Sequence, residues 1–191
     1  MVRALSVDDL FSLATLEGPL PYHDKRVTAL VWELKYRGSA RAAALAGEFL
    51  SDLALAEAAE CLGKPLLIPM PMHAARRHER GFNQTELLCE AVMKHLAPRY
   101  DSGQKLQKVF DYAPQVLERV RNTAPQQGLA RQKRLTNVKG SMHVANPARV
   151  RGRVCIVVDD VSTTGASFAE AQRVLLRAGA EAVSCVALAV S

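Results

Sequence analysis

The stretch VCIVVDDVSTTGAS, residues 154–167, joins an apolar run to a polar turn and decides the fold. Its first five residues are apolar, which is typical of a strand in a parallel sheet that is covered on both faces. The run stops at two adjacent carboxylates, Asp159 and Asp160, and continues into hydroxyl residues and a glycine. Parallel sheets bind ligands outside the carboxyl ends of their strands, so this turn is the first candidate for a binding site.

The residues that follow complete a parallel crossover unit. ASFAEAQRVLLRAG has the apolar spacing of an amphipathic helix that ends at Gly179, and AVSCVALAV is a second apolar strand. Strand, helix and strand in this order predict a right-handed crossover between parallel strands. Further upstream, KPLLIPMPM predicts another buried strand, because Pro69 and Pro71 would break a helix.

Helical patterns dominate the N-terminal third and return after the loop predicted for HAARRHERGFN. We therefore expect a helical N-terminal region, residues 1–63, packed on an α/β domain of residues 64–191 in a single compact unit. The rest of 98–150 is expected to be irregular. The predicted helices are Ser6 with DDLFSLATL, DKRVTALVWELKYRG ending at Gly38, residues 40–60, QTELLCEAVMKHL with Asn83 as N-cap, and a short helix at 125–135.

Composition limits the class of protein. The 191 residues suffice for one well-filled core. No apolar run reaches the roughly 18 residues of a membrane span, and the first residues lack a secretory cleavage pattern, so we expect a soluble cytoplasmic protein without membrane insertion. The four cysteines are far apart, without the close pair of a zinc or redox motif, and are expected to be buried thiols: Cys61, Cys89, Cys155 and Cys185.

Positive charge is concentrated between Gln115 and Arg153, where Glu118 is the single acid. Such a segment attracts anions, either phosphorylated small molecules or nucleic acid. Its basic residues are Arg119, Arg121, Arg131, Lys133, Arg134, Lys139, Arg149, Arg151 and Arg153.

The turn after Asp160 has the chemistry of an anion site. Backbone N–H groups in a tight Thr-Thr-Gly turn at a helix N-terminus form a concave nest that suits a phosphate monoester. The two aspartates are suited to sugar hydroxyls and to a hydrated Mg²⁺. Two other interpretations are a helix-capping pair with ordinary turn residues, and a Mg²⁺ site for another phosphate chemistry. The nucleotide loops GxxxxGK[ST] and GxGxxG are absent.

Several motifs resemble known families. VVDDVSTTGAS resembles the signature that binds phosphoribosyl pyrophosphate (PRPP) in type I phosphoribosyltransferases. IPMPMHAARRHERGFNQTELL, LERVRNTAPQQGLARQKRLTNVKGSM and ELKYRG resemble the ComF family, which is tied to competence and DNA utilisation. The resemblance covers roughly residues 20–191. It implies an α/β fold, a type I phosphoribosyltransferase-like parallel sheet flanked by helices, with a helical N-terminal extension.

The resemblance also implies roles for single residues. The acids would hold the ribose hydroxyls and, through the ligand, Mg²⁺, while Thr163 to Ser167 wrap the 5′-phosphate. ComF proteins commonly begin with a four-cysteine zinc module that this sequence lacks, so no zinc is expected. The implied PRPP-binding residues are Asp159, Asp160, Val161, Ser162, Thr163, Thr164, Gly165, Ala166 and Ser167; those of the pyrophosphate loop are Pro71, Met72, His73, Arg76, Arg77 and Arg80; and those of a lid or nucleic-acid surface are Arg119, Arg121 and Arg134.

Two hypotheses about function follow. In the first, the protein binds PRPP with Mg²⁺ and, if catalytic, transfers the phosphoribosyl group to a nitrogen nucleophile as pyrophosphate leaves. In the second, it is a non-catalytic accessory protein that binds single-stranded DNA, or a DNA-translocating partner such as a competence helicase, through the basic segment. Few aromatic residues accompany that segment, only Phe110 and Tyr112 nearby. The acceptor, turnover and oligomeric state, a homodimer included, stay open.

Overall fold

A five-stranded parallel sheet forms the centre of the computed structural model, which describes residues 19–59, 61–97, 109–122 and 138–191. Each pair of neighbouring strands runs in parallel. The strand order is β1-β7-β6-β2-β3, with β1 at Leu20–Pro21, β2 at Leu66–Pro69, β3 at Asp111–Tyr112, β6 at Val154–Ser162 and β7 at Ala182–Val190.

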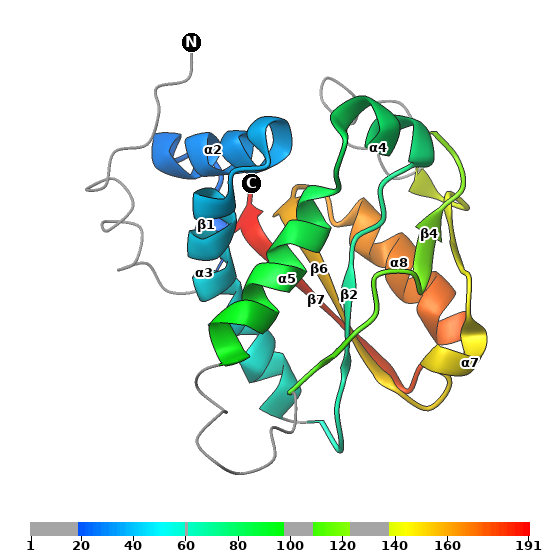
Figure 1. The fold of residues 1–191 in the computed structure, drawn as a ribbon. Helices are drawn as coiled ribbons and strands as arrows, with labels where there is room; N and C mark the ends of the chain where they lie inside the picture. Colours follow the sequence, from blue (N-terminus) through cyan, green and yellow to red (C-terminus); the bar gives the residue numbers. More distant parts are fainter. Residues whose placement is uncertain (1–18, 60, 98–108, 123–137) are drawn as a thin grey trace.

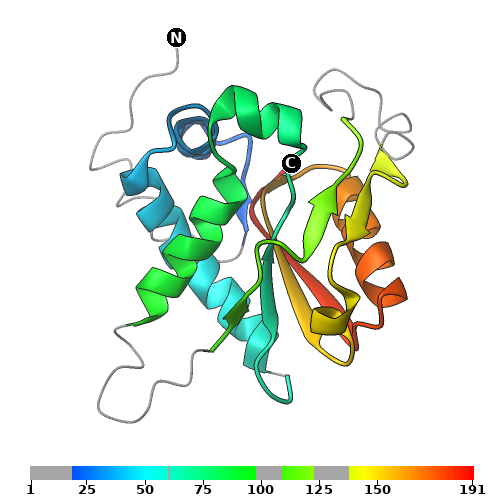
Figure 2. The same cartoon turned by 45° about the vertical axis from the view of Figure 1, so that its right-hand side comes forward.

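Helices cover both faces of this sheet, as Figures 1 and 2 show. One face carries α2 (Lys25–Trp32), its π-helical continuation η1 (Glu33–Arg37), α3 (Ala40–Ala59) and α5 (Gln84–Leu96). The other carries α8 (Ala166–Arg177) and the antiparallel pair β4 (Leu117–Arg119) and β5 (Met142–Val144), with the short α7 (Pro147–Val150) nearby. α4 (Ala74–Arg80) lies above the end of the sheet at which β6 and β7 finish.

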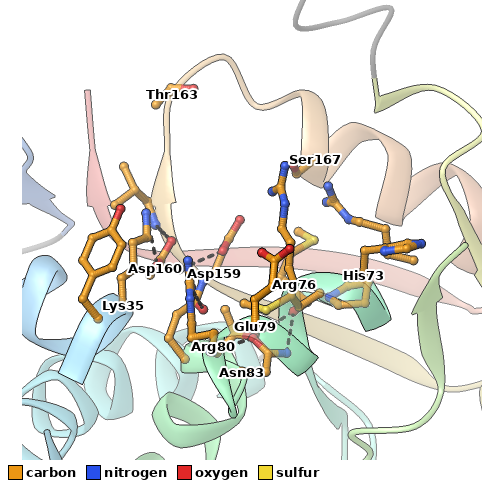
Figure 3. A pocket seen from close by; sticks show the side chains of 18 of the residues that line it. Lys35, His73, Arg76, Glu79, Arg80, Asn83, Asp159, Asp160, Thr163 and Ser167 are labelled. Atoms are coloured by element: carbon orange, nitrogen blue, oxygen red, sulfur yellow. Dashed lines mark hydrogen bonds and ion pairs between the residues drawn. The ribbon is translucent and has the colours of Figure 1, made fainter. Parts of the chain in front are cut away.

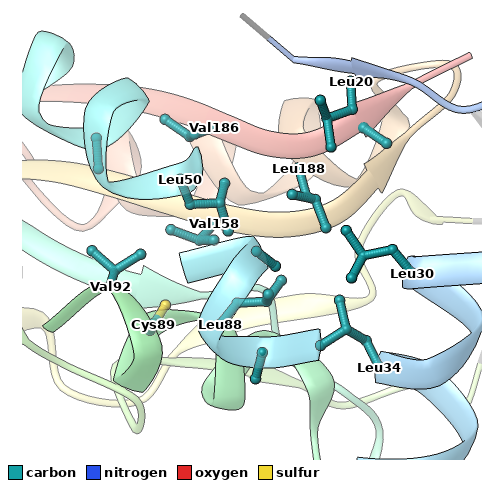
Figure 4. Packing of buried hydrophobic residues seen from close by; sticks show 14 of the residues in the cluster. Leu20, Leu30, Leu34, Leu50, Leu88, Cys89, Val92, Val158, Val186 and Leu188 are labelled. Carbon is teal, nitrogen blue, oxygen red and sulfur yellow. The ribbon is translucent and has the colours of Figure 1, made fainter. Parts of the chain in front are cut away.

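The N-terminal helices share a hydrophobic cluster with the sheet (Figure 4). Leu30, Leu34 and Leu50 are fully buried against Val158 of β6 and Leu188 of β7. The helix α2 therefore has a fixed position relative to the carboxyl ends of the strands.

The strands and helices predicted between residues 64 and 97 and between residues 154 and 190 are confirmed. β2, β6, α8 and β7 occupy the predicted segments, and α5 begins after Asn83, whose side-chain oxygen accepts a hydrogen bond from the Thr85 backbone N–H at 3.2 Å. α3 and the helix that ends at Gly38 are confirmed as well, the latter with a π-helical last turn. The helices predicted at Ser6 and at 125–135 lie outside the described residues.

Two local predictions are wrong. The part of 98–150 that was expected to be irregular contains β3, β4, β5 and α7. HAARRHERGFN contains the helix α4 instead of only a loop. His73 caps this helix, since its ring Nδ1 accepts a hydrogen bond from the Ala75 backbone N–H at 3.2 Å. Gly81 ends it with a positive φ. The helix buries none of its own residues, so no apolar stripe marks it in the sequence.

The strand β6 continues past the two acids to Ser162. On one side it pairs with β7 as far as Ser162 opposite Val190, but on the other side its pairing with β2 ends at Val158 opposite Pro69. Asp159 and Asp160 therefore lie where the neighbouring strand has stopped and space opens at the end of the sheet.

Candidate functional site

The two acids of β6 face different layers of the molecule. Side chains alternate along a strand, so Asp159 shares a face with Val157, which packs beneath α8, and Asp160 shares a face with Val158, which packs against the N-terminal helices. Asp160 is only 3% exposed, and Asp159 is partly buried. Each carboxylate thus lies in its own surroundings although the residues are adjacent.

Asp160 is held by the backbone and by a lysine from the N-terminal region (Figure 3). One of its oxygens accepts a hydrogen bond from the Val161 backbone N–H at 2.7 Å, and the other lies 3.3 Å from the ammonium of Lys35. Burial opposes the charge on Lys35, but the attraction of Asp160 and Asp159 outweighs it and the pKa of Lys35 is raised. Lys35 is therefore charged throughout the physiological pH range.

The negative charge of Asp159 is less well compensated by neighbouring groups. Burial, and then repulsion from Asp160, raise its pKa to about 7, against the opposing effects of the Asp160 backbone N–H, Lys35 and Arg119. That backbone N–H donates to the Asp159 carboxylate at 2.9 Å. A carboxyl group that is this costly to ionise is suited to a bound hydrogen-bond donor or cation.

The turn that follows forms a small hollow of about 20 Å³ in front of α8. Gly165, with φ 71°, is the N-cap of this helix, and the Thr164 hydroxyl accepts a hydrogen bond from the Ala166 backbone N–H at 3.4 Å. The first N–H groups of a helix have no partner within the helix, and its dipole favours negative charge there. The hollow is lined by Asp159, Val161, Ser162, Thr163, Thr164, Gly165, Ala166, Ser167 and Phe168.

This hollow adjoins a larger cleft of about 870 Å³ at the carboxyl end of the sheet (Figure 3). The acids form part of its lining, the segment after β2 (residues 70–73) and α4 supply one wall, and η1 supplies another. The cleft brings together residues from every layer of the fold: Tyr22, Lys35, Tyr36, Met70, Pro71, Met72, His73, Arg76, Glu79, Arg80, Asn83, Gln84, Thr85, Arg119, Asp159, Asp160, Val161, Thr163, Ser167 and Ser191.

Most of the residues predicted for the pyrophosphate loop line the cleft. Pro71, Met72, His73, Arg76 and Arg80 do so. Arg77 lies outside the cleft lining and binds Glu86 of α5 through two hydrogen bonds, at 2.5 and 2.7 Å. The helical form of α4 explains this, since residues four apart share a helix face and Arg77 projects beside it.

The three arginines predicted for a lid or nucleic-acid surface lie apart. Arg119, at the end of β4, lines the cleft; burial lowers its pKa against the attraction of Asp159. Arg121 is exposed and donates to the Lys139 carbonyl. Arg134 lies outside the described residues.

A buried polar network fixes the wall between β2 and α5. The carbonyl oxygen of Met70 lies 2.7 Å from the Thr85 hydroxyl and 3.2 Å from the Asn83 side-chain amide, which donates to it. Both side chains are buried. This network holds the chain at the point where it leaves β2 and enters the cleft.

Sequence reasoning did not assign site roles to Lys35, Tyr36, Tyr22 or Glu79, which all line the cleft. Lys35 and Tyr36 appeared only as part of ELKYRG, a motif noted for its resemblance. Nothing in the local pattern of these residues indicates that they meet a strand far along the chain.

The donor set available for a metal ion is small. Within the described residues, no group of three or more His, Cys, Asp and Glu side chains could hold a metal ion. A Mg²⁺ ion here would need most of its oxygen ligands from a bound molecule and water. In the same part of the chain, no helix has the length and apolar character needed to cross a membrane.

Comparison with known proteins gives matches over most of the chain. A model of the phosphoribosyl transferase domain matches residues 106–191. The DNA utilization protein YhgH of Salmonella typhi is 36% identical over 159 residues, which are 82% of this chain and 64% of that protein. Competence protein F of Haemophilus influenzae is 29% identical over 125 residues, 64% of this chain and 49% of that protein. The chain thus spans less than two thirds of these relatives.

A solved hypoxanthine phosphoribosyl transferase of Trypanosoma cruzi aligns with 81% of this chain and 63% of its own, with a TM-score of 0.41 and 11% identity. The predicted fold class is confirmed by the helix-flanked parallel sheet together with the matched domain. The names of the relatives agree with the resemblance inferred from the motifs.

Proposed function

We propose that this chain, which matches a phosphoribosyl transferase domain over residues 106–191 and is similar to DNA utilization protein YhgH and competence protein F, binds PRPP. The observation that carries the proposal is the continuity of the anion hollow, the acid pair and the cationic wall within one cleft. The three features match the phosphate, the ribose diol and the diphosphate of PRPP in the order in which the ligand carries them.

In this proposal the 5′-phosphate occupies the hollow in front of α8. The backbone N–H groups and hydroxyls of Thr163 to Ser167 bind it, and the helix dipole adds to the attraction. The carboxylates of Asp159 and Asp160 accept hydrogen bonds from the ribose hydroxyls, which are the kind of donor that a partly compensated acid pair favours.

The diphosphate would face the cations of the opposite walls, Arg76 and Arg80 of α4 and Arg119 of β4. These side chains neutralise the charge of the leaving group. Mg²⁺ bound to the diphosphate would neutralise more of it, and Asp159 and Asp160 are the carboxylates placed to orient such a complex.

If an acceptor is present, transfer is a displacement at the anomeric carbon. A nitrogen lone pair forms the new bond to C1 while the C1–O bond breaks and pyrophosphate leaves with the electron pair. Positive charge develops on the sugar, and the negative acids beside it stabilise that charge.

Calorimetry with PRPP and Mg²⁺ tests the binding step. At pH 8, where most of Asp159 is ionised, Asp159→Asn removes a charged acceptor and should weaken binding by about 1.5–3 kcal/mol. Glu181→Gln is a matched control, because this exposed acid precedes β7 at the opposite end of the sheet. Equal affinity of Asp159→Asn and wild type would refute the assignment of this acid to the ribose.

Turnover is a separate question. Release of pyrophosphate from PRPP should be measured with purines, pyrimidines and simple amines as acceptors. Release that depends on one acceptor and is lost in Asp159→Asn would assign transferase activity. Binding of PRPP without release in any of these mixtures would favour a protein that responds to the ligand without transferring it.

The accessory function remains a second candidate, because four basic residues of the 115–153 segment are exposed: Arg121, Lys139, Arg149 and Arg151. The remaining described ones are engaged elsewhere, Arg119 in the cleft and Arg153 with Asp111 at 2.8 Å. Binding of single-stranded DNA should be measured from low to high salt, because neutralised phosphates give a steep salt dependence. A salt-insensitive or absent signal would refute this candidate.

A further inference from the structure

Lys35 reaches the ligand cleft from an unusual segment of the N-terminal region. It lies in the π-helical turn Glu33–Arg37 that continues α2. Single π-helical turns are rare and frequently occur at functional sites. This turn directs the ammonium to within 3.3 Å of the Asp160 carboxylate (Figure 3).

The turn packs against the last residue of α4 and the segment that leads into α5. The Arg80 guanidinium lies over the ring of Tyr36, 5.6 Å from its centroid. A Cβ added at Gly38 would lie 3.1 Å from two ring atoms of Phe82, so the backbone there approaches the ring as closely as a glycine allows. The motifs ELKYRG and RGFNQ, far apart in sequence, thus contact each other at two points and hold Lys35 in place.

The ion pair between Lys35 and Asp160 offsets the cost of burying the Asp160 carboxylate. The side chain of Asp160 is 5% exposed and that of Lys35 is 23% exposed, so neither is fully solvated. A buried carboxylate without a partner is strongly destabilising, and the group then takes up a proton or moves. The ammonium also offsets the repulsion between Asp160 and Asp159. A carboxylate oxygen has two lone pairs, so Asp160 can still accept a ligand hydroxyl.

We propose that Lys35 is a positioning residue of the ligand site, which holds the Asp160 carboxylate in the orientation that accepts a hydrogen bond from a ribose hydroxyl. The inference rests on the proposed function and deepens it, because it makes the N-terminal helical region part of the binding site. Lys35 acts through Asp160, so its loss affects every ligand that carries the ribose and spares inorganic phosphate.

Calorimetry of Lys35→Met with three probes tests this. Affinity for PRPP and for ribose 5-phosphate should fall by the same factor, about 10- to 100-fold, while affinity for inorganic phosphate is unchanged. Lys35→Arg keeps the charge and should recover most of the loss. Lys25→Met removes the same charge from an exposed position of α2 and serves as the matched control.

The double variant Lys35→Met/Asp160→Asn guards against misfolding, because it leaves no unpaired charge. It should bind the ribose ligands no more weakly than Asp160→Asn alone, since both variants lose the same carboxylate. A further loss in the double variant would mean that Lys35 acts independently of Asp160, and would overturn the inference.

Other outcomes are equally decisive. If Lys35→Met weakens PRPP binding but not ribose 5-phosphate binding, Lys35 contacts the diphosphate and the positioning role is wrong. Unchanged or tighter ribose binding by folded Lys35→Met would also overturn it, with the proposed function intact. Wild-type protein that binds neither ribose ligand would refute the proposed function and this inference together.

Discussion

Most carboxylates in folded proteins stabilise the fold more as the pH rises, but Asp159 should have the opposite effect. Asp159→Asn should remove this effect. Burial and the neighbouring Asp160 raise the pKa of Asp159 from 3.8 to about 7 in the folded protein. The folded state therefore binds more protons than the unfolded state between these values. Stability falls as the pH rises through this window, because the folded protein must ionise a carboxyl group that resists ionisation.

The magnitude follows from the size of the shift. One pKa unit corresponds to about 1.4 kcal/mol, so roughly three units set an upper limit of about 4 kcal/mol for complete titration. Between pH 5 and pH 8 the part titrated corresponds to about 2–3 kcal/mol. Asparagine resembles the protonated acid, so the variant should match wild type at pH 5 and be more stable at pH 8.

Urea unfolding of wild type and Asp159→Asn at several pH values between 5 and 8 measures their difference in unfolding free energy. Titration of groups that both proteins share cancels in this difference. Asp24→Asn is the control, because a hydrogen bond from Arg26 lowers the pKa of Asp24 to about 2. Its stabilisation is present above pH 4 and is lost only as the pH falls further, so its difference from wild type should be flat from pH 5 to 8. A flat difference for Asp159→Asn as well would refute the reasoning.

Four more substitutions test the turn before α8 and the packing around the sheet. Gly165→Ala and Gly152→Ala replace glycines with φ of 71° and 66°, where an added Cβ meets nothing within 4 Å; each should cost about 1 kcal/mol in urea unfolding, but only the first should weaken phosphate binding. Gly47→Ala should destabilise by about 1–3 kcal/mol, because its Cβ would lie 2.6 Å from the nearest Cβ of α5; equal melting temperatures would contradict this. Thr85→Val should lower the unfolding free energy by about 1–2 kcal/mol, since the Met70 carbonyl loses its 2.7 Å contact, and an unchanged value would show that the contact contributes nothing.

The fold could be predicted where the pattern is local. The apolar run of β6 predicts a strand without reference to distant residues, and so does the short apolar run before Pro69 and Pro71. Both strands, β6 and β2, are confirmed. α4 could not be predicted in this way, because its seven residues bury nothing and carry no apolar stripe. Its cap, His73, is not among the residue types that usually begin a helix.

The candidate site also has parts that follow from local sequence and parts that depend on the fold. Thr163 to Ser167 are contiguous, so the anion hollow can be derived from one short segment. Lys35 and Arg119 reach the cleft only because the chain folds, and neither has a local signal that points to Asp159 or Asp160. The sequence could not show which arginines of α4 line the cleft, because that depends on the helix face on which each one lies.

The adjacency of the two acids has a structural consequence of its own. Neighbouring residues of a strand face opposite sides, so no single cation on one layer can compensate both Asp159 and Asp160 fully. Asp160 is paired with Lys35 from the N-terminal helices, and Asp159 is affected by Arg119 from β4 on the other layer. Asp160 has the ammonium of Lys35 at 3.3 Å, whereas burial and the charge of Asp160 leave Asp159 with a raised pKa and incomplete compensation. A ligand with a diol next to a phosphate would offset that deficit, so we expect its binding to raise stability most where Asp159 is ionised, above about pH 7.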